Sequence, residues 1–277
     1  MLHKMLFGAS IGLMLAAQAS FAGDLDMISA PEVDIVQSSV GQGWYIRGDL
    51  GFAGAIDADK PNFRSLDGAG GYSQGVFDDG RFSKPFSYGA GMGYQFNDYL
   101  RADATVDFIN GSVDGTSRLG SRCSAGQSVG TDCALSHEAD YTGIGLMANG
   151  YVDLGTYVGF TPYVGAGVGL THLAWDDVTA RPYCVAGAAA CNGTAYNPIT
   201  YEGKESIRFS YALMAGVAYD LTNRIKFDLG YRYSDIAGGD MYNFSAAENA
   251  LGASGVKGKD EGFTRHEIRA GIRLNTW

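Results

Sequence analysis

The segment Leu100-Arg-Ala-Asp-Ala-Thr-Val-Asp-Phe108 decides the fold of this chain. Its even positions are apolar or small, and its odd positions carry arginine, aspartate, threonine and aspartate. Successive side chains of a β-strand point to opposite faces, so this strict alternation predicts a strand with one apolar and one polar face. Roughly 9–11 residues are enough for a tilted strand to cross a bilayer. The segment therefore predicts a strand that faces lipid on one side.

The same alternation returns along the whole chain. A soluble two-sheet sandwich also alternates, but its outward face is polar. Here the apolar face is the aromatic-rich one and the polar face carries opposed charges, which favours a barrel with lipid outside. Eight strands are predicted, at 44–54, 86–96, 100–108, 142–154, 162–170, 209–221, 225–233 and from about 265 to 274.

The connections between these strands differ in length from one end of the barrel to the other. Short links fall near 97–98, 155–160 and 222–224, and long ones at 56–82, 109–140, 174–208 and 234–264. Short periplasmic turns and long outer loops are typical of outer-membrane barrels. We therefore predict an all-β fold, an eight-stranded antiparallel up-and-down transmembrane β-barrel with four long extracellular loops. Acidic residues outnumber basic ones in all four loops.

The N-terminus has the pattern of an export signal. A basic head with Lys4 precedes an apolar run, and Ala-Ser-Phe-Ala at 19–22 supplies small residues for cleavage. The run is too short to span a bilayer core of about 30 Å. We expect residues 1–22 to be a cleaved signal peptide, residues 23–43 to be a periplasmic segment, and residues 44–277 to form the outer-membrane barrel.

Charge and cysteine content narrow the possible partners and chemistry. Loss of Lys4 with the signal peptide changes the net charge from −10 to −11, which argues against a nucleic-acid partner. Cysteines at 123, 133, 184 and 191 form two close pairs without zinc-site spacing. In an oxidising compartment, local disulfides Cys123–Cys133 and Cys184–Cys191 are the preferred interpretation, although four cysteines allow three pairings.

The polar face of the predicted strands carries equal numbers of positive and negative side chains. An eight-stranded barrel is only wide enough for its own side chains, and charges removed from water must be paired. We therefore predict an ion-pair network that plugs the lumen, with a narrow conducting path as the alternative. Its members are Arg47, Asp49, Arg101, Asp103, Asp107, Asp153, Lys226, Asp228, Arg232, Glu267, Arg269 and Arg273.

Aromatic residues gather where the predicted strands meet the short turns. Aromatic girdles mark the two interfaces of membrane barrels. The set assigned to the periplasmic girdle is Trp44, Tyr45, Tyr94, Phe96, Tyr99, Tyr157, Phe160, Tyr219 and Trp277.

Three segments carry a family resemblance: GWYIRGDLG at 43–51, TPYVGAGVG at 161–169 and KFDLGYRY at 226–233. They resemble the small opacity-protein-like outer-membrane β-barrel proteins, often labelled "porin family", of alphaproteobacteria. The resemblance implies an eight-stranded barrel inserted by the outer-membrane assembly machinery, and it implies no catalytic residues. Trp277 matches the family's terminal aromatic assembly signal. The third and fifth positions from the end, Asn275 and Arg273, depart from its apolar pattern.

These patterns predict a structural surface barrel of the Gram-negative cell outer membrane, a monomer in contact with lipid and lipopolysaccharide. The alternatives are a low-conductance porin for small polar solutes and a surface binder, either an adhesin or a haem-binding protein using His137, Tyr196, Tyr201 and Tyr242. Ser136 beside His137 matches no catalytic motif, so we expect no enzyme activity. No calcium-loop motif occurs, and no metal or cofactor is expected.

Overall fold

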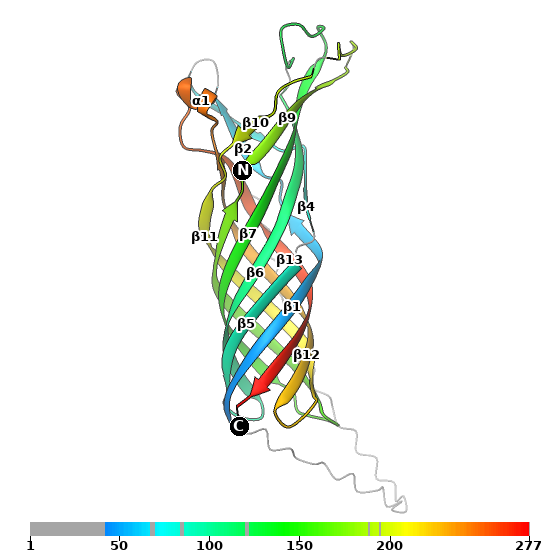
Figure 1. Ribbon diagram of the computed structural model, residues 1–277, viewed down its shortest axis with the longest axis vertical. Coiled ribbons are helices and arrows are strands. Elements are labelled where there is room, and N and C mark those ends of the chain that lie inside the picture. The colour runs from blue at the N-terminus through cyan, green and yellow to red at the C-terminus, as the bar shows by residue number, and fades with distance from the viewer. Residues whose placement is uncertain are drawn as a thin grey trace, which may run out of the picture. The chain divides into compact units, whose positions relative to one another are not determined.

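Eight long antiparallel strands form a closed ring in the computed structural model (Figure 1). The structure describes residues 42–66, 70–83, 86–119, 122–187, 189–193 and 195–276. Each ring strand pairs with the ring strands before and after it in the chain, and β1 pairs with β13 to close the sheet. The ring strands are β1 (Gly43–Ala58), β5 (Phe86–Gln95), β6 (Leu100–Arg118), β7 (Asp132–Asp153), β8 (Phe160–Trp175), β11 (Glu205–Asp220), β12 (Ile225–Asn243) and β13 (Val256–Asn275). The predicted eight-stranded up-and-down barrel is confirmed.

The alternation in the sequence becomes the division between the wall's two faces. In β6, Arg101 and Asp103 point inward and are 2% and 6% exposed, whereas Leu100 and Val106 point outward and are 47% and 37% exposed. The other ring strands repeat this arrangement, so a band of large apolar side chains covers the outside of the barrel. Such an exposed band needs lipid around it.

A short turn joins β5 to β6 at one end of the barrel. The Asn97 side chain accepts hydrogen bonds from the backbone N–H groups of Tyr99 and Leu100, each at 2.8 Å. An asparagine that bonds its own backbone two residues on is a common turn former. Short connections also follow β7 and β11 at this end, where the chain leaves β13 (Figure 1).

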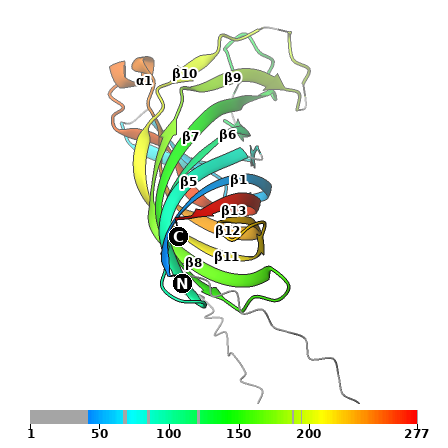
Figure 2. The same cartoon turned by 60° about the horizontal axis from the view of Figure 1, so that its bottom comes forward.

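The long connections at the other end are folded, which differs from the loops that we expected. The β6–β7 ladder continues without a break to the pair Arg118↔Ala134, well beyond the predicted strand ends at 108 and 142. Inside these connections lie β2 (Asn62–Leu66), β3 (Tyr72–Val76), β4 (Asp79–Phe82), β9 (Val178–Val185), β10 (Ile199–Tyr201) and helix α1 (Ala246–Ala250). Figures 1 and 2 show β9 lying beside the outer part of β7, with which it pairs, at this end of the barrel.

The periplasmic girdle needs one correction. Trp44 is 57% exposed and packs edge-to-face on Tyr94, at 5.3 Å between ring centroids. Tyr45 is fully buried instead, because neighbouring residues of a strand point to opposite faces. It belongs to the lumen.

The two chain ends lie mostly outside the described residues. These include the predicted signal peptide at 1–22, nearly all of the segment at 23–43, and Trp277. In the last strand, Ile272 and Leu274 face outward while Arg273 and Asn275 face inward. No helix among the described residues is long and apolar enough to cross a membrane.

Candidate functional site: barrel lumen and mouth

In the periplasmic half of the lumen, several polar side chains bond directly or indirectly to Arg47. Its guanidinium donates to both carboxylate oxygens of Asp49, at 2.7 and 2.8 Å, and to Asp103 at 2.9 Å. Asp103 also accepts hydrogen bonds from the Tyr45 hydroxyl at 3.0 Å and from the Asn149 amide at 2.8 Å. Two carboxylates thus share one guanidinium, and neutral donors satisfy the remaining oxygens.

Arg101 is the most enclosed cation of this region. Its Nε lies 3.1 Å from Asp153, and its side chain is 0% exposed. The guanidinium carbon sits 4.0 Å from the ring centroid of Tyr151 and 4.7 Å from that of Tyr163. The terminal nitrogens of Arg101 have no hydrogen-bond partner among the described residues, so the ring faces stabilise this charge.

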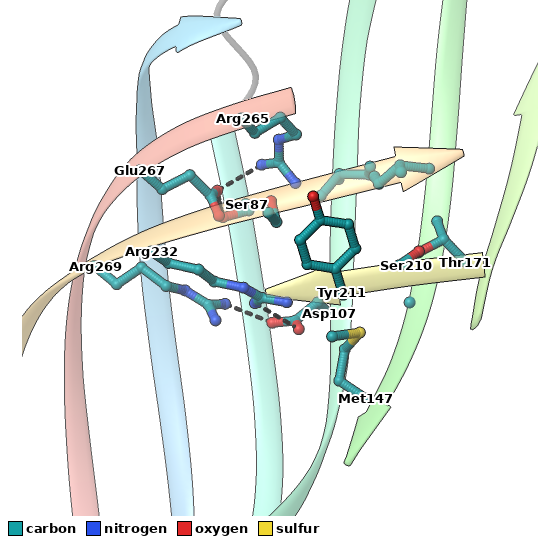
Figure 3. A pocket seen from close by; sticks show the side chains of 14 residues that line it. Ser87, Asp107, Met147, Thr171, Ser210, Tyr211, Arg232, Arg265, Glu267 and Arg269 are labelled. Atoms are coloured by element: carbon teal, nitrogen blue, oxygen red, sulfur yellow. Dashed lines mark hydrogen bonds and ion pairs between the residues drawn. The ribbon is translucent and has the colours of Figure 1, made fainter. Parts of the chain in front are cut away.

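A second cluster lies nearer the mouth, on β6, β12 and β13 (Figure 3). Asp107 is bridged by Arg232 at 2.8 Å and by Arg269 at 2.5 Å. Beside it, Glu267 accepts from Arg265 at 2.5 Å and from the Ser87 hydroxyl at 2.6 Å. The two ion pairs of Asp107 cross the barrel interior and connect strands that are far apart in the sequence, whereas Arg265 and Glu267 both lie on β13.

All twelve side chains that we predicted for the lumen point inward, and each takes part in an ion pair. Arg273 lies 3.4 Å from Asp228, and Lys226 lies 2.6 Å from Asp220. The predicted charges are therefore paired inside the barrel.

Sequence reasoning missed three charged residues of the interior and one partner at its edge. Arg208 and Asp260 pair at 2.7 Å with side chains 1% exposed each, and Arg265 pairs with Glu267. Lys226 pairs with Asp220, whose side chain is 22% exposed. All four lie at or just beyond the ends of the predicted strands. The inward phase of the predicted strands already includes Asp220 and Arg265 and reaches Arg208 one residue further on. Asp260 does not follow that phase, because the strand changes phase at Gly262, which has a positive φ of 93°.

Above the charges, the inward positions become apolar. A cluster of buried side chains fills the mouth, contributed by ring strands and by the strands of the long connections. Four aromatic rings at its centre pack with centroid distances of 5.1–6.4 Å: Phe82, Tyr141, Trp175 and Phe263. This mouth cluster separates the charged lumen from the extracellular end.

The connection between β12 and β13 packs over the mouth cluster. The buried Lys257 ammonium donates to the Tyr201 hydroxyl at 3.0 Å and pairs with Glu248 of α1. α1 begins with a capping box, in which Ser245 and Glu248 each bond the other's backbone N–H. The guanidinium of Arg64 in β2 lies 5.6 Å from the ring centroid of Phe244, so two connections meet here.

The four cysteines form Cys123–Cys133 and Cys184–Cys191, the pairing preferred from the sequence. Cys133 and Cys184 are direct partners in the β7–β9 ladder, so the two disulfides are neighbours. Gln127 joins their loops.

The amide of Gln127 donates to Asn192 Oδ1 at 2.6 Å and to the Tyr196 hydroxyl, and its Oε1 accepts from the Asn192 N–H at 3.2 Å. Gln127 itself is only 3% exposed. The outer end of the β6–β7 hairpin, called the tip below, is therefore held by covalent and polar cross-links.

His137 lies inside this folded end rather than in a solvated loop. It is 6% exposed, its Nε2 is 2.9 Å from Ser117 Oγ, and Phe77 packs against its ring. Burial, together with the nearby Lys257, lowers the pKa of His137 from 6.5 to about 4. Ser136, its sequence neighbour, points to the opposite face of β7.

Burial removes three of the four residues of the haem set suggested by the sequence, His137, Tyr201 and Tyr242, while the fourth, Tyr196, is half-buried. Tyr201 and Tyr242 are 3% and 1% exposed and belong to the mouth cluster. Neither tyrosine side chain is accessible to a haem group from solvent. Within the described ranges, no three His, Cys, Asp or Glu side chains are grouped as a metal site would require.

Known proteins similar to this chain agree with its architecture. The family model described as "Outer membrane protein beta-barrel domain" matches residues 9–254. A Brucella abortus (strain 2308) protein is 33% identical over 283 residues, covering 95% of this chain and 94% of the relative. A Rickettsia felis protein named "Putative adhesin" is 25% identical and covers 90% of this chain and 97% of its own.

Among solved structures, the outer membrane protein OprG from Pseudomonas aeruginosa covers 86% of this chain and 98% of its own, with a TM-score of 0.49 and 18% identity. The family match spans most of the chain, including seven of the eight barrel strands. The chain belongs to the outer membrane protein beta-barrel domain family and is a protein of the Gram-negative outer membrane.

Proposed function

We propose that this protein is a closed, structural outer-membrane barrel that displays a folded extracellular platform. The observation that carries the proposal is the apolar mouth cluster above the paired charges. An ion entering the lumen would have to cross both an apolar layer and a set of bonded ion pairs. Both are costly for an unpaired charge.

The proposal includes the protein's surroundings. Lipid covers the exposed apolar band, and lipopolysaccharide meets the wall at its outer edge. The outer-membrane assembly machinery inserts the chain with the help of Trp277. The ring strands pair on both sides, so the barrel itself has no free edge and needs no second copy. The protein then acts as a monomer, and its surface role lies in the acidic extracellular end rather than in catalysis.

Electrical recording tests the closed lumen directly against the low-conductance porin. The refolded protein in planar bilayers is expected to stay silent, and regular conductance steps would refute the proposal. A variant with alanine at Phe82, Tyr141 and Trp175 opens the mouth but retains the ion pairs, so it should also stay silent. Adding Arg232→Ala and Asp107→Ala to it also removes the ion pairs next to the mouth, leaving the Arg47 and Arg101 clusters as the remaining barrier, and should produce the first conductance steps, provided that the folded band persists on gels.

A contact role for the platform is the second candidate. It is supported by the name of the Rickettsia felis relative and by the cross-linked tip. Displayed on a Gram-negative host that lacks the protein, the intact barrel should increase adherence to cultured cells. Replacing residues 122–132 by a Gly-Ser linker together with Cys133→Ser should abolish the gain. If the tip replacement leaves the increase in adherence unchanged, the tip has no part in this role. If the intact protein does not increase adherence, the contact role itself is refuted.

A further inference from the structure

A small cavity of about 20 Å³ lies between the Asp107 cluster and the mouth cluster (Figure 3). Its walls come from seven ring strands, and its floor is the bridge from Arg232 through Asp107 to Arg269. The inward faces of β8, β11 and β12 add the hydroxyls of Thr171, Ser210 and Ser234. Such a volume exceeds the roughly 10–15 Å³ needed to hold one water molecule, and it leaves no room for a polyatomic ligand.

The lining carries more positive than negative charge. Arg232, Arg265 and Arg269 face Asp107 and Glu267, which gives three cations against two anions. The second lumen cavity, about 20 Å³ on the other side of the same bridge, is also lined by one more cation than anions. Asp49, the nearest further carboxylate of that region, is bonded through both of its oxygens to Arg47. On the mouth side of the bridge, the arginines therefore outnumber the carboxylates that could pair with them.

The polar atoms left without partners around the cavity are mainly donors. The Nε atoms of Arg232, Arg265 and Arg269 and the hydroxyl of Ser234 have no hydrogen-bond partner in the described chain. Ser234 is 4% exposed and lines the cavity directly. Buried donors normally find an acceptor, and each fully buried lining atom that has no partner in the described chain is able to donate.

We propose that this cavity is a binding site for one monatomic monovalent anion, chloride in the physiological setting. Such an ion accepts hydrogen bonds in every direction, fits a one-atom volume and balances the excess positive charge. The Ser234 hydroxyl donates to it, and the guanidiniums of Arg265 and Arg269 flank it. The anion is bound during folding, because the mouth cluster and the ion pairs close the cavity from both ends.

Bromide provides the direct test, because it has the charge of chloride and a strong anomalous signal. The full mature protein would be refolded and crystallised in sodium bromide. An anomalous peak in the cavity is expected. A water molecule only, with ordinary density and no anomalous signal, would overturn the proposal.

Thermal stability gives an independent readout without crystals. The temperature at which the fast-migrating folded band disappears should rise by several degrees when sodium gluconate is replaced by sodium chloride at equal ionic strength, because a ligand that binds only the folded state stabilises it. The rise should shrink at least by half in Ser234→Ala. It should disappear in Arg265→Gln, which balances the lining charge.

Two threonines form a matched control pair. Thr171 lines the cavity and bonds Ser210 at 2.6 Å, whereas Thr161 bonds Thr156 at 2.6 Å near a periplasmic turn. Thr171→Val should reduce the chloride effect, and Thr161→Val should leave it intact. If Arg265→Gln fails to fold, the chloride effects measured in Ser234→Ala and in the two threonine variants still test the proposal. Equal chloride effects in all variants would overturn the proposal.

Discussion

Acidification should loosen the extracellular end through His137. The pKa of this imidazole is lowered from 6.5 to about 4, mainly by burial, so the folded protein excludes a proton that the unfolded chain binds. Between these two pKa values the unfolded state binds more protons, and stability is lost as the pH falls. The loss is about 2 kcal/mol at pH 5 and about 3 kcal/mol at pH 4, at roughly 1.36 kcal/mol for each pKa unit. Above pH 6.5 the effect is absent.

The three tryptophans make the measurement specific. Trp175 is 4% exposed in the mouth cluster, so Trp44→Phe with Trp277→Phe leaves one fluorophore that reports on the extracellular end. Urea titrations in detergent at pH 7.5 and pH 5 should differ in midpoint by about 1 M, given slopes of about 1–3 kcal/mol per molar.

Carboxylates also titrate in this range, so the comparison between variants decides the outcome. His137→Gln retains a partner for Ser117 but cannot become charged, and its stability should fall less on acidification, by about 2 kcal/mol at pH 5. His172→Gln, at an exposed histidine, should behave as the parent protein does. If His137→Gln and the parent lose the same stability between pH 7.5 and pH 5, the reasoning is wrong.

Three further changes test the interior and the tip. Asp107→Asn leaves two buried arginines without their carboxylate and should cost about 3–5 kcal/mol in urea unfolding, with Asp98→Asn in a turn as a neutral control. Cys123→Ser with Cys133→Ser removes a short covalent loop worth about 3 kcal/mol, and it should sensitise the tip to proteases while the barrel band persists. Gly93→Val places a side chain against the ring of Tyr45, so the folded band should be lost or weakened; retention of full heat resistance would contradict this packing.

The membrane-level fold was predictable because lipid imposes a strict pattern. Alternation located all eight strands, and strand phase placed charges such as Arg47 and Asp107 in the lumen. Prediction weakened where that pattern ends. Tyr45 was grouped with Trp44 as an interface aromatic although its position in the strand pointed it inward. Arg208 and Arg265 were missed because they lie at the ends of the alternating segments.

The mouth cluster was not predictable for a physical reason. The inward phase of β7 runs unchanged from Asn149 to Ala139, but its side chains change from polar to apolar. Outside the bilayer the wall obeys the ordinary rule of a soluble protein, with apolar residues inside. The inward positions are then apolar and the regular alternation of polar and apolar residues is lost. Residues 109–141 are therefore predicted as a loop from the sequence. The cavity depends on long-range contacts between strands, which no local pattern records.

The unbroken β6–β7 ladder has a mechanical consequence. A pull on the tip acts along both strands, which are held in the membrane wall by their other neighbours, β5 and β8. The hydrogen bonds of an antiparallel ladder lie perpendicular to the strands. Tension on the tip therefore loads many of these bonds at once in shear instead of opening them one after another. A force on the tip would in this way pass from the cell surface into the membrane wall.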